Sequence, residues 1–203
     1  MTAAVRSCFG AATFLVTTLA LVVITSCSGP GAASGAAGMT GLDVDLLRIT
    51  GRYPEHNEVA YTNYTGVSAG YGWTGSVNAM SNNIINYNNV HQVTQIMADG
   101  AALYTLSNQQ PASQMQYNYL HDYQTSQWAD YGDNGIYLDE QTSGYTIAHN
   151  AMVNAPTNVA QNHTGQNTIT DNPTTNPQSV TSMAGIEASY ADVKNTTIPS
   201  ASF

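Results

Sequence analysis

The sequence predicts an all-β fold, a parallel β-helix of about four to five coils that ends in a short C-terminal capping helix. An Asn recurs in a similar apolar setting at positions 88, 118, 150 and 172, at intervals of 30, 32 and 22 residues. Two strand-like segments, 101–106 and 135–138, repeat with an offset of 33 residues when Leu103 is aligned with Ile136. Repeats of this length are typical of solenoids, in which each coil buries its apolar face against its neighbours.

The composition favours short strands and tight turns. Only 8% of the 203 residues are charged, where an ordinary soluble domain has about 25%. Asn, Gln, Thr, Ser, Gly and Tyr replace the missing charge, and these residues suit strands and turns more than amphipathic helices. The hydrophobic share of 42% argues against disorder driven by charge.

The charge balance excludes one class of partner. The chain has 4 Lys+Arg against 13 Asp+Glu, a formal net charge of -9. Its basic residues all lie outside positions 53–193, so this stretch has no cation to neutralise a phosphate backbone. We therefore expect no nucleic-acid partner.

The N-terminal segment is expected to direct export. Arg6 precedes an apolar run from Phe9 to Ile24, which is typical of a signal peptide and short for a membrane span. The run ends in Ile-Thr-Ser-Cys at 24–27, which resembles the lipobox of bacterial lipoproteins. We expect a lipoprotein signal peptide over 1–26 and lipidation at Cys27, hence a lipid-anchored protein of the bacterial cell envelope. An ordinary signal peptide, which would give a secreted protein, is the alternative.

The remaining chain divides into three parts. Residues 27–41 are nearly all Gly, Ala and Ser and are expected to form a flexible tether. Residues 42–193 are long enough for one domain, and 194–203 form a tail. Within 182–193 we expect a short capping helix with Ile186, Tyr190 and Val193 on one face. One cysteine would remain after processing, so no internal disulfide can form. We expect the protein to be a monomer.

The recurring Asn is expected to be structural. Asn tolerates the left-handed conformation of a sharp corner, and its side-chain amide can bond to the Asn of the next coil. The competing fold is an antiparallel sandwich. However, the chain has no Asn-Gly or Asp-Gly turn between two alternating runs, and Asn134-Gly135 precedes a continuous apolar run instead.

Three consecutive segments carry a resemblance to a known family: ADGAALYTL at 98–106, MQYNYLHD at 115–122 and NGIYLDE at 134–140. They look like coils of secreted right-handed parallel β-helix glycoside hydrolases with the pectate-lyase-like superfold, and they resemble glycoside hydrolase family 141. Family 120 xylosidases carry a comparable Ile-Tyr-Leu-Asp strand. The resemblance spans about Glu55 to Val193 and implies right-handed coils and a carbohydrate ligand. Family members are longer, so the chain resembles only the C-terminal half of such an enzyme.

Glycoside hydrolysis needs two carboxyl groups beside the scissile bond, one protonated and one ionised. With the family's acidic positions as a guide, we expect Asp139 to be the nucleophile and Asp99 the general acid. Glu140 is the rival of Asp139, because adjacent strand residues point to opposite faces. The alternative is that Asp99 caps a turn and that 139–140 is a solvated strand end. With few cations in the domain, little is expected to lower the pKa of either Asp if it is buried.

Further residues are candidates for binding a sugar. The rings of Trp73, Tyr104 and Tyr137 could stack on pyranose faces, although an inward-pointing aromatic would simply be core. His121 and Asp122 could orient an acid or bind a sugar hydroxyl, or could be structural turn residues.

The sequence thus predicts a surface-anchored or secreted glycoside hydrolase for neutral plant or microbial glycans, similar to fucosidases, xylanases or xylosidases. A truncated, non-catalytic glycan-binding module is one alternative. A polysaccharide lyase is another, but its uronate substrate would be repelled by the acidic domain. A Ca²⁺-assisted lyase could use Asp122, Asp130 and Asp133, whose spacing matches no dedicated calcium loop.

No cofactor or metal is expected. The chain contains no phosphate-binding glycine loop, no Cys-x-x-Cys and no His-Glu-x-x-His. His91 and His121 follow equivalent segments and could stack on each other, but zinc would need further ligands.

Overall fold

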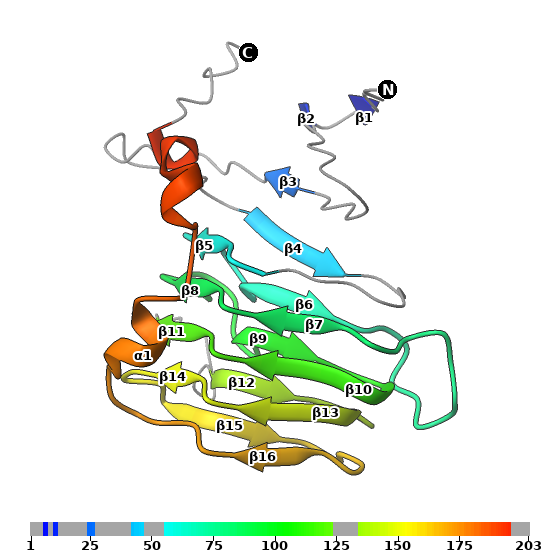
Figure 1. The fold of residues 1–203 in the computed structure, drawn as a ribbon. Coiled ribbons are helices and arrows are strands. Elements are labelled where there is room, and N and C mark those ends of the chain that lie inside the picture. Colours follow the sequence, from blue (N-terminus) through cyan, green and yellow to red (C-terminus); the bar gives the residue numbers. More distant parts are fainter. Residues whose placement is uncertain are drawn as a thin grey trace.

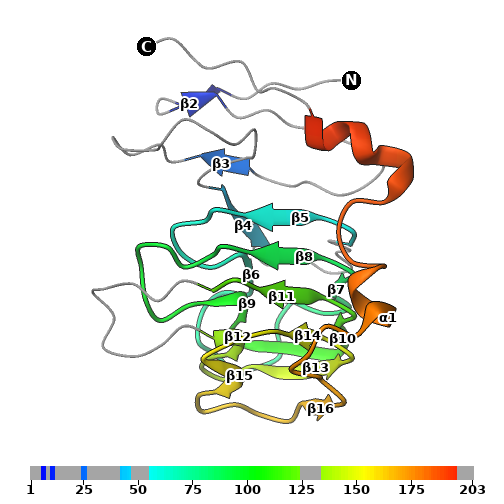
Figure 2. The ribbon, with the colours of Figure 1, turned by 90° about the vertical axis from the view of Figure 1, so that its left-hand side faces the viewer.

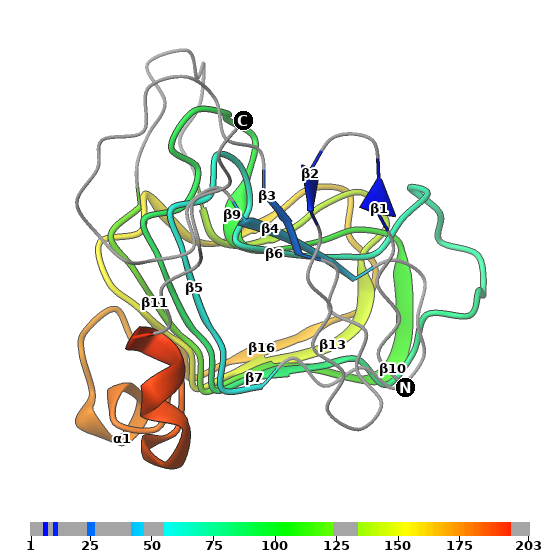
Figure 3. The same ribbon diagram turned by 90° about the horizontal axis from the view of Figure 1, so that it is seen from above.

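The computed structural model describes residues 6–7, 10–11, 24–26, 42–46, 55–123 and 134–195. The described part is almost entirely β-structure, and three sheets wrap around a common interior (Figure 3). Outside this framework, β1 (Arg6–Ser7) and β2 (Gly10–Ala11) form an antiparallel pair.

We number the three sheets in the order in which each coil, starting from β6, passes through them. Sheet 1 contains β3 (Ile24–Ser26), β4 (Leu42–Leu46), β6 (Val67–Ala69), β9 (Ala101–Thr105), β12 (Asn134–Leu138) and β15 (Thr157–Gln161). Sheet 2 contains β7 (Ile84–Asn86), β10 (Asn108–Gln116), β13 (Ser143–Ala148) and β16 (Thr168–Thr170). Sheet 3 contains β5 (Glu58–Ala60), β8 (Asn89–His91), β11 (Tyr119–His121) and β14 (Ala151–Met152).

Successive coils pass through the sheets in the order 1, 2, 3 and stack on one another (Figures 1 and 2). Coil 1 is β6, β7 and β8, coil 2 is β9, β10 and β11, coil 3 is β12, β13 and β14, and coil 4 is β15 and β16. Within the three sheets every described pairing is parallel except that of β3 with β4. The fold is a right-handed parallel β-helix, as the sequence predicted, and the antiparallel sandwich is excluded.

The core consists of three columns of apolar side chains, one on the inner face of each sheet. Register partners in successive coils form them: Val67, Leu103, Ile136 and Val159 on sheet 1; Ile85, Met115, Ile147 and Ile169 on sheet 2; Val59, Val90, Leu120 and Met152 on sheet 3. The members in coils 2 and 3 are completely buried. Burial of each such side chain stabilises the fold by roughly 1.5–3 kcal/mol, so stacked coils are stable where a single coil would not be.

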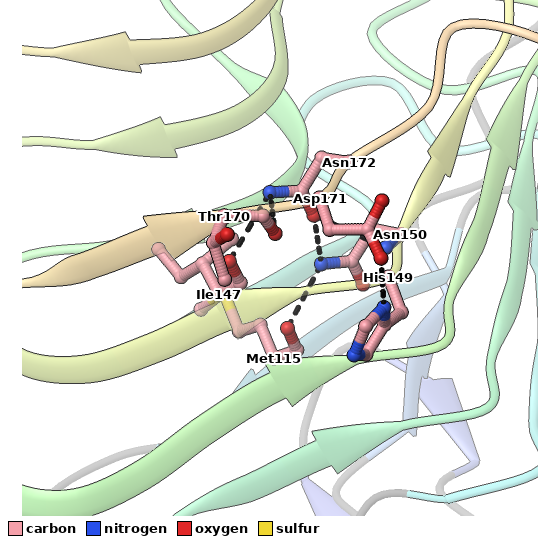
Figure 4. A network of polar contacts seen from close by, with 7 residues as sticks. All are labelled: Met115, Ile147, His149, Asn150, Thr170, Asp171 and Asn172. Atoms are coloured by element: carbon pink, nitrogen blue, oxygen red, sulfur yellow. Dashed lines mark hydrogen bonds and ion pairs between the residues drawn. The ribbon is translucent and has the colours of Figure 1, made fainter.

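A ladder of Asn residues follows the corner between sheets 2 and 3. At each step the backbone N–H and the side-chain amide of one Asn both donate to the Oδ1 of the Asn in the next coil, at 2.8 to 3.1 Å. The rungs are Asn57, Asn88, Asn118, Asn150 and Asn172. Figure 4 shows the lower end, where the Asn150 amide also donates to the carbonyl of Met115. The predicted ladder is confirmed, and it includes one rung, Asn57, that the sequence pattern did not indicate.

We had expected the ladder Asn itself to adopt the left-handed conformation. Instead, the residue before each of these Asn residues adopts it. Tyr87, Tyr117 and His149 have φ values of 55°, 55° and 59°. Their rings stack in a column outside the corner, with centroids 5.2 Å apart for the first pair and 4.8 Å apart for the second. The reason is geometric: the Asn must direct its amide along the stack, so the residue before it makes the turn. The column continues to Asp171, whose Oδ2 lies 2.7 Å from Nδ1 of His149 (Figure 4).

The C-terminal segment forms helical structure, as predicted, but it starts before residue 182 and does not cap the last coil. It comprises α1 (Gln178–Thr181), which buries Val180, and after a bend the 3-10 helix η1 (Ala188–Asn195). The Gly185 N–H donates to the carbonyl of Tyr87 at 2.7 Å, so the chain runs back beside coil 1 instead of covering coil 4 (Figure 2). The expected apolar face is not formed, because Tyr190 is 60% exposed.

Several predictions lie outside the described residues: the lipidated Cys27, the tether over 27–41, and two of the possible calcium ligands, Asp130 and Asp133. Among the described residues, no helix combines the length and the apolar character that crossing a membrane would require.

We predict that Asn118→Ala destabilises the protein by about 2–4 kcal/mol, because it leaves the N–H groups of Asn88 and the carbonyl of Ile85 buried without their partner. Urea denaturation measures the free energy of unfolding. Asn172→Ala at the partly buried end of the ladder is the matched control and should cost less than half as much. Equal losses for the two variants would contradict the ladder as the main corner interaction.

Candidate functional site

The outer face of sheet 1 presents a row of tyrosines. Tyr104 and Tyr137 are register partners on β9 and β12, and their strand neighbours Leu103 and Ile136 belong to the inner core. The two tyrosines pack in a separate cluster, with ring centroids 5.5 Å apart and planes at 83°. Tyr64 extends the row, 6.3 Å from Tyr104. Both predicted tyrosines therefore lie on the outside of the coil and not in its interior.

Asp139 follows β12 directly and lies beside this row. The Tyr104 hydroxyl donates to its Oδ2 at 2.5 Å, and the Asn162 side-chain amide donates to its Oδ1 at 2.8 Å. Asp139 is 7% exposed and Tyr104 is 8% exposed. Asn162 takes the same place in coil 4 as Asp139 in coil 3, because Leu138 pairs with Gln161. The sequence pattern gave no reason to select Asn162, but this register identifies it.

Hydrogen bonds keep the Asp139 carboxyl ionised. Burial alone would raise its pKa, but hydrogen bonds from Tyr104, Asn162, the Glu140 backbone and Tyr137 outweigh burial and hold the pKa below its usual value. Burial, followed by the hydrogen bond to Asp139, raises the pKa of Tyr104 far above that of a free tyrosine. Our expectation that little would lower the pKa of a buried Asp139 was wrong, because neutral donors act here in place of cations.

Asp99 lies at the other end of the same face. It precedes β9, in a left-handed conformation with φ of 62°, and its carbonyl accepts a hydrogen bond from the Tyr64 hydroxyl at 2.8 Å. Asp139 comes after the end of the neighbouring strand, so the two carboxylates start from opposite ends of sheet 1. Tyr104 lies between them, and both contribute to raising its pKa.

Glu140 points away from the tyrosines. Its Oε1 lies 3.0 Å from Nδ1 of His163, in the turn of the next coil, and this contact raises the pKa of His163. The carbonyl of Glu140 accepts a hydrogen bond from the backbone of Ser107 in the turn of coil 2. Asp139 and Glu140 therefore have different neighbours, as expected for adjacent residues, and Asp139 is the one that contacts the tyrosine row.

Trp73 is presented to solvent by the turn of coil 1 at the same corner. Trp73 and Tyr71 are 62% and 51% exposed, with ring centroids 6.4 Å apart. Ser107 holds this turn from the next coil, because its hydroxyl donates to the Tyr71 carbonyl and accepts from the Thr74 N–H, both at 2.9 Å. The sequence analysis selected neither Tyr71 nor Ser107. Tyr71 could have been found from its spacing, because it lies two residues before Trp73.

His121 and Asp122 lie elsewhere, at the end of β11 in sheet 3. His121 stacks on His91, with centroids 4.9 Å apart, and its two ring nitrogens lie 2.9 Å from Asp122 and from Asn89. Burial lowers the pKa of His121 although Asp122 opposes the shift. The predicted histidine stack is confirmed, and this pair is not joined to the carboxylates of sheet 1. Within the described ranges, no group of three or more His, Cys, Asp or Glu side chains could hold a metal ion.

Comparison with known proteins gives one informative likeness. No family model matches the chain, and no curated protein matches it. A solved structure described as a glycoside hydrolase matches with a TM-score of 0.67 and 30% sequence identity. The match covers 74% of this chain and 25% of that enzyme. The chain thus resembles a glycoside hydrolase over most of its length while spanning about a quarter of the length of that protein.

We predict that Tyr104→Phe raises the pKa of Asp139 and lowers the free energy of unfolding at neutral pH by about 1–3 kcal/mol, since a hydrogen bond to a charged group is lost. A carboxylate whose pKa is lowered by folding contributes stability above its unfolded-state pKa, and the contribution is lost as the pH falls through the folded-state value. The difference between the two proteins should therefore shrink in acid.

The side-chain carboxyl resonance of Asp139, followed by NMR against pH, measures this shift. Tyr64→Phe is the control, because that hydroxyl donates to the Asp99 carbonyl. An Asp139 pKa that is the same in wild type and Tyr104→Phe would contradict the assigned role of the tyrosine.

Proposed function

We propose that the protein is carbohydrate-active, most specifically a glycoside hydrolase that acts on neutral plant or microbial glycans of the fucoside or xyloside type. The observation that supports this most is an Asp held ionised on the outer face of sheet 1, in a chain that is 30% identical to a glycoside hydrolase. Two carboxyl groups in opposite protonation states are what the reaction requires.

In the proposed mechanism Asp139 is the ionised group. Its lowered pKa suits a nucleophile or base, and it makes a general acid the less suitable role. Asp99 would then be the general acid that protonates the leaving oxygen. Because the two carboxylates start from opposite ends of sheet 1, this role requires both side chains to reach one scissile bond over the tyrosine row. Glu140 is the rival of Asp139 for the role of the ionised group, but its carboxylate contacts His163 and not the tyrosine row, so we keep Asp139 in the proposal.

The aromatic residues suit a sugar ligand. Trp73 is exposed at the corner next to the Glu140 turn, and Tyr137 is partly exposed beside Asp139. Flat rings at such positions can stack on the apolar faces of pyranoses. Tyr104 would act by positioning Asp139, and His121 with Asp122 would contact only a glycan long enough to reach sheet 3.

A non-catalytic glycan-binding module is the second candidate, and one observation favours it. Both oxygens of Asp139 already accept hydrogen bonds from protein donors, at 2.5 and 2.8 Å. A carboxylate bound in this way suits a structural role, in which case the exposed Tyr71 and Trp73 would be the binding residues.

Turnover separates the two candidates. The full chain is assayed against aryl fucosides, aryl xylosides and plant glycans, alongside Asp139→Asn and Asp99→Asn. We expect each substitution to lower kcat at least about 100-fold, the scale of one acid, base or nucleophile. Asp171→Asn is the matched control, because this carboxylate is 69% exposed and pairs with His149.

The outcomes are distinct. Turnover that survives both substitutions would exclude the carboxylate-pair mechanism. Binding without turnover, lost in Trp73→Ala but kept in Asp139→Asn, would identify a glycan-binding module. Circular dichroism of each variant shows that the fold is kept.

We also propose that the protein is anchored to the bacterial cell envelope through a lipid on Cys27. The supporting observation is the Ile-Thr-Ser-Cys sequence that follows the apolar run. In a bacterial host, wild type should fractionate with membranes and incorporate labelled fatty acid, and Cys27→Ala should do neither. Labelling that persists in Cys27→Ala, or its absence from wild type, would contradict the anchor; Cys8→Ala is the control.

A further inference from the structure

The apolar core is open at coil 4. In the inner column of sheet 2, Ile85, Met115 and Ile147 are 0% exposed, whereas Ile169 is 37% exposed. Val159, the last member of the sheet 1 column, is also only partly buried. The next coil would cover these side chains, so apolar surface that faces the interior elsewhere meets solvent here.

Among the described residues, two sheets also end here in a strand edge that pairs with no further strand. β15 is the outermost strand of sheet 1 and β16 the outermost strand of sheet 2. Sheet 3 ends differently, because the N–H of Met152 donates to the carbonyl of Pro173. As far as residue 195, the described chain that follows does not return over β15 and β16, since it runs through α1 to Gly185 beside Tyr87 of coil 1 (Figure 1).

These edges lack the features that usually keep strand edges apart. Edge strands are commonly protected by charged side chains, prolines within the strand or bulges. β15 reads Thr-Asn-Val-Ala-Gln and β16 reads Thr-Ile-Thr. Asp171 is the one acidic residue in 153–177, where Lys and Arg are absent, and it is paired with His149. Two copies of this chain, each with a net charge of -9, therefore meet little repulsion at this face.

We propose that the end face formed by β15, β16, Val159 and Ile169 binds the same face of a second copy, which gives an end-to-end dimer. A second copy fits because its core columns have the same spacing and its face is equally free of charge. A two-fold axis through sheet 2 would pair β16 with β16 of the second copy as antiparallel strands. The two Ile169 side chains would then close each other's core. This inference does not depend on the proposed function.

The dimer departs from the monomer expected from the sequence, and association in solution decides between them. Sedimentation velocity of the full chain over about 1–100 μM, the range for modest interfaces, should show a monomer–dimer equilibrium. Thr168→Lys places a charge on the exposed side of β16. It should raise the dissociation constant at least about tenfold, because the two lysines would be diagonal neighbours across the paired strands, within reach of such long side chains.

Ser76→Lys is the matched control, because it adds the same charge on an exposed turn of coil 1. It should leave the dissociation constant unchanged. Any association through other parts of the full chain would be the same in both lysine variants, so a difference between them reports on β16. Hydrogen exchange supplies a second readout. Amides of 157–161 and 168–170 should exchange more slowly at high concentration in wild type and in Ser76→Lys, and not in Thr168→Lys.

A wild-type protein that stays monomeric throughout would overturn the proposal. The proposal would also be overturned if Thr168→Lys associated as strongly as wild type and the amide hydrogen exchange of β16 did not depend on protein concentration. Assemblies larger than a dimer that Thr168→Lys dissolves would overturn the two-fold arrangement.

Discussion

The Asn ladder is the interaction on which the rest of this structure depends. Each central rung has a fully buried amide whose donors and acceptor are used only when successive coils are in register. A shift of one residue would leave several of these groups buried without partners, at a cost of about 1–3 kcal/mol each. The ladder therefore fixes which residues stack. The left-handed residue before each rung costs about 1–2 kcal/mol, which ladder hydrogen bonds and ring stacking offset.

The register of the coils also explains how a protein with so few cations stabilises the ionised form of a buried carboxylate. Stacking of coils 2, 3 and 4 brings Tyr104, Asp139 and Asn162 to equivalent or neighbouring positions on one face. Their neutral donors hold Asp139 ionised, where an ordinary domain would use Lys or Arg. The low charge of the chain and its acidic candidate site are thus compatible, because hydrogen bonding supplies the stabilisation.

The fold was largely predictable and the site only in part, for identifiable physical reasons. The corner Asn and the strand offset report directly on coil length, so the architecture could be derived. Asn57 was missed because Pro54 stands where other coils have an apolar residue, although a ring residue before Asn, as in His56-Asn57, was a usable signal. The outward direction of Tyr104 could not be derived, because both faces of β9 are buried and alternation is lost. The contact of Asp139 with Asn162 could not be derived either, because the last coil is shorter than the others and its register with coil 3 is known only from the structure.

The most direct test of this account is amide hydrogen exchange at the backbone N–H groups of Asn88, Asn118 and Asn150, each of which donates to the side chain of the next rung. They should exchange only through global unfolding, with protection that matches the free energy of unfolding measured by urea. Exchange as fast as that of the exposed turn at Ser76 would contradict the claim that the ladder fixes the stacking of the coils.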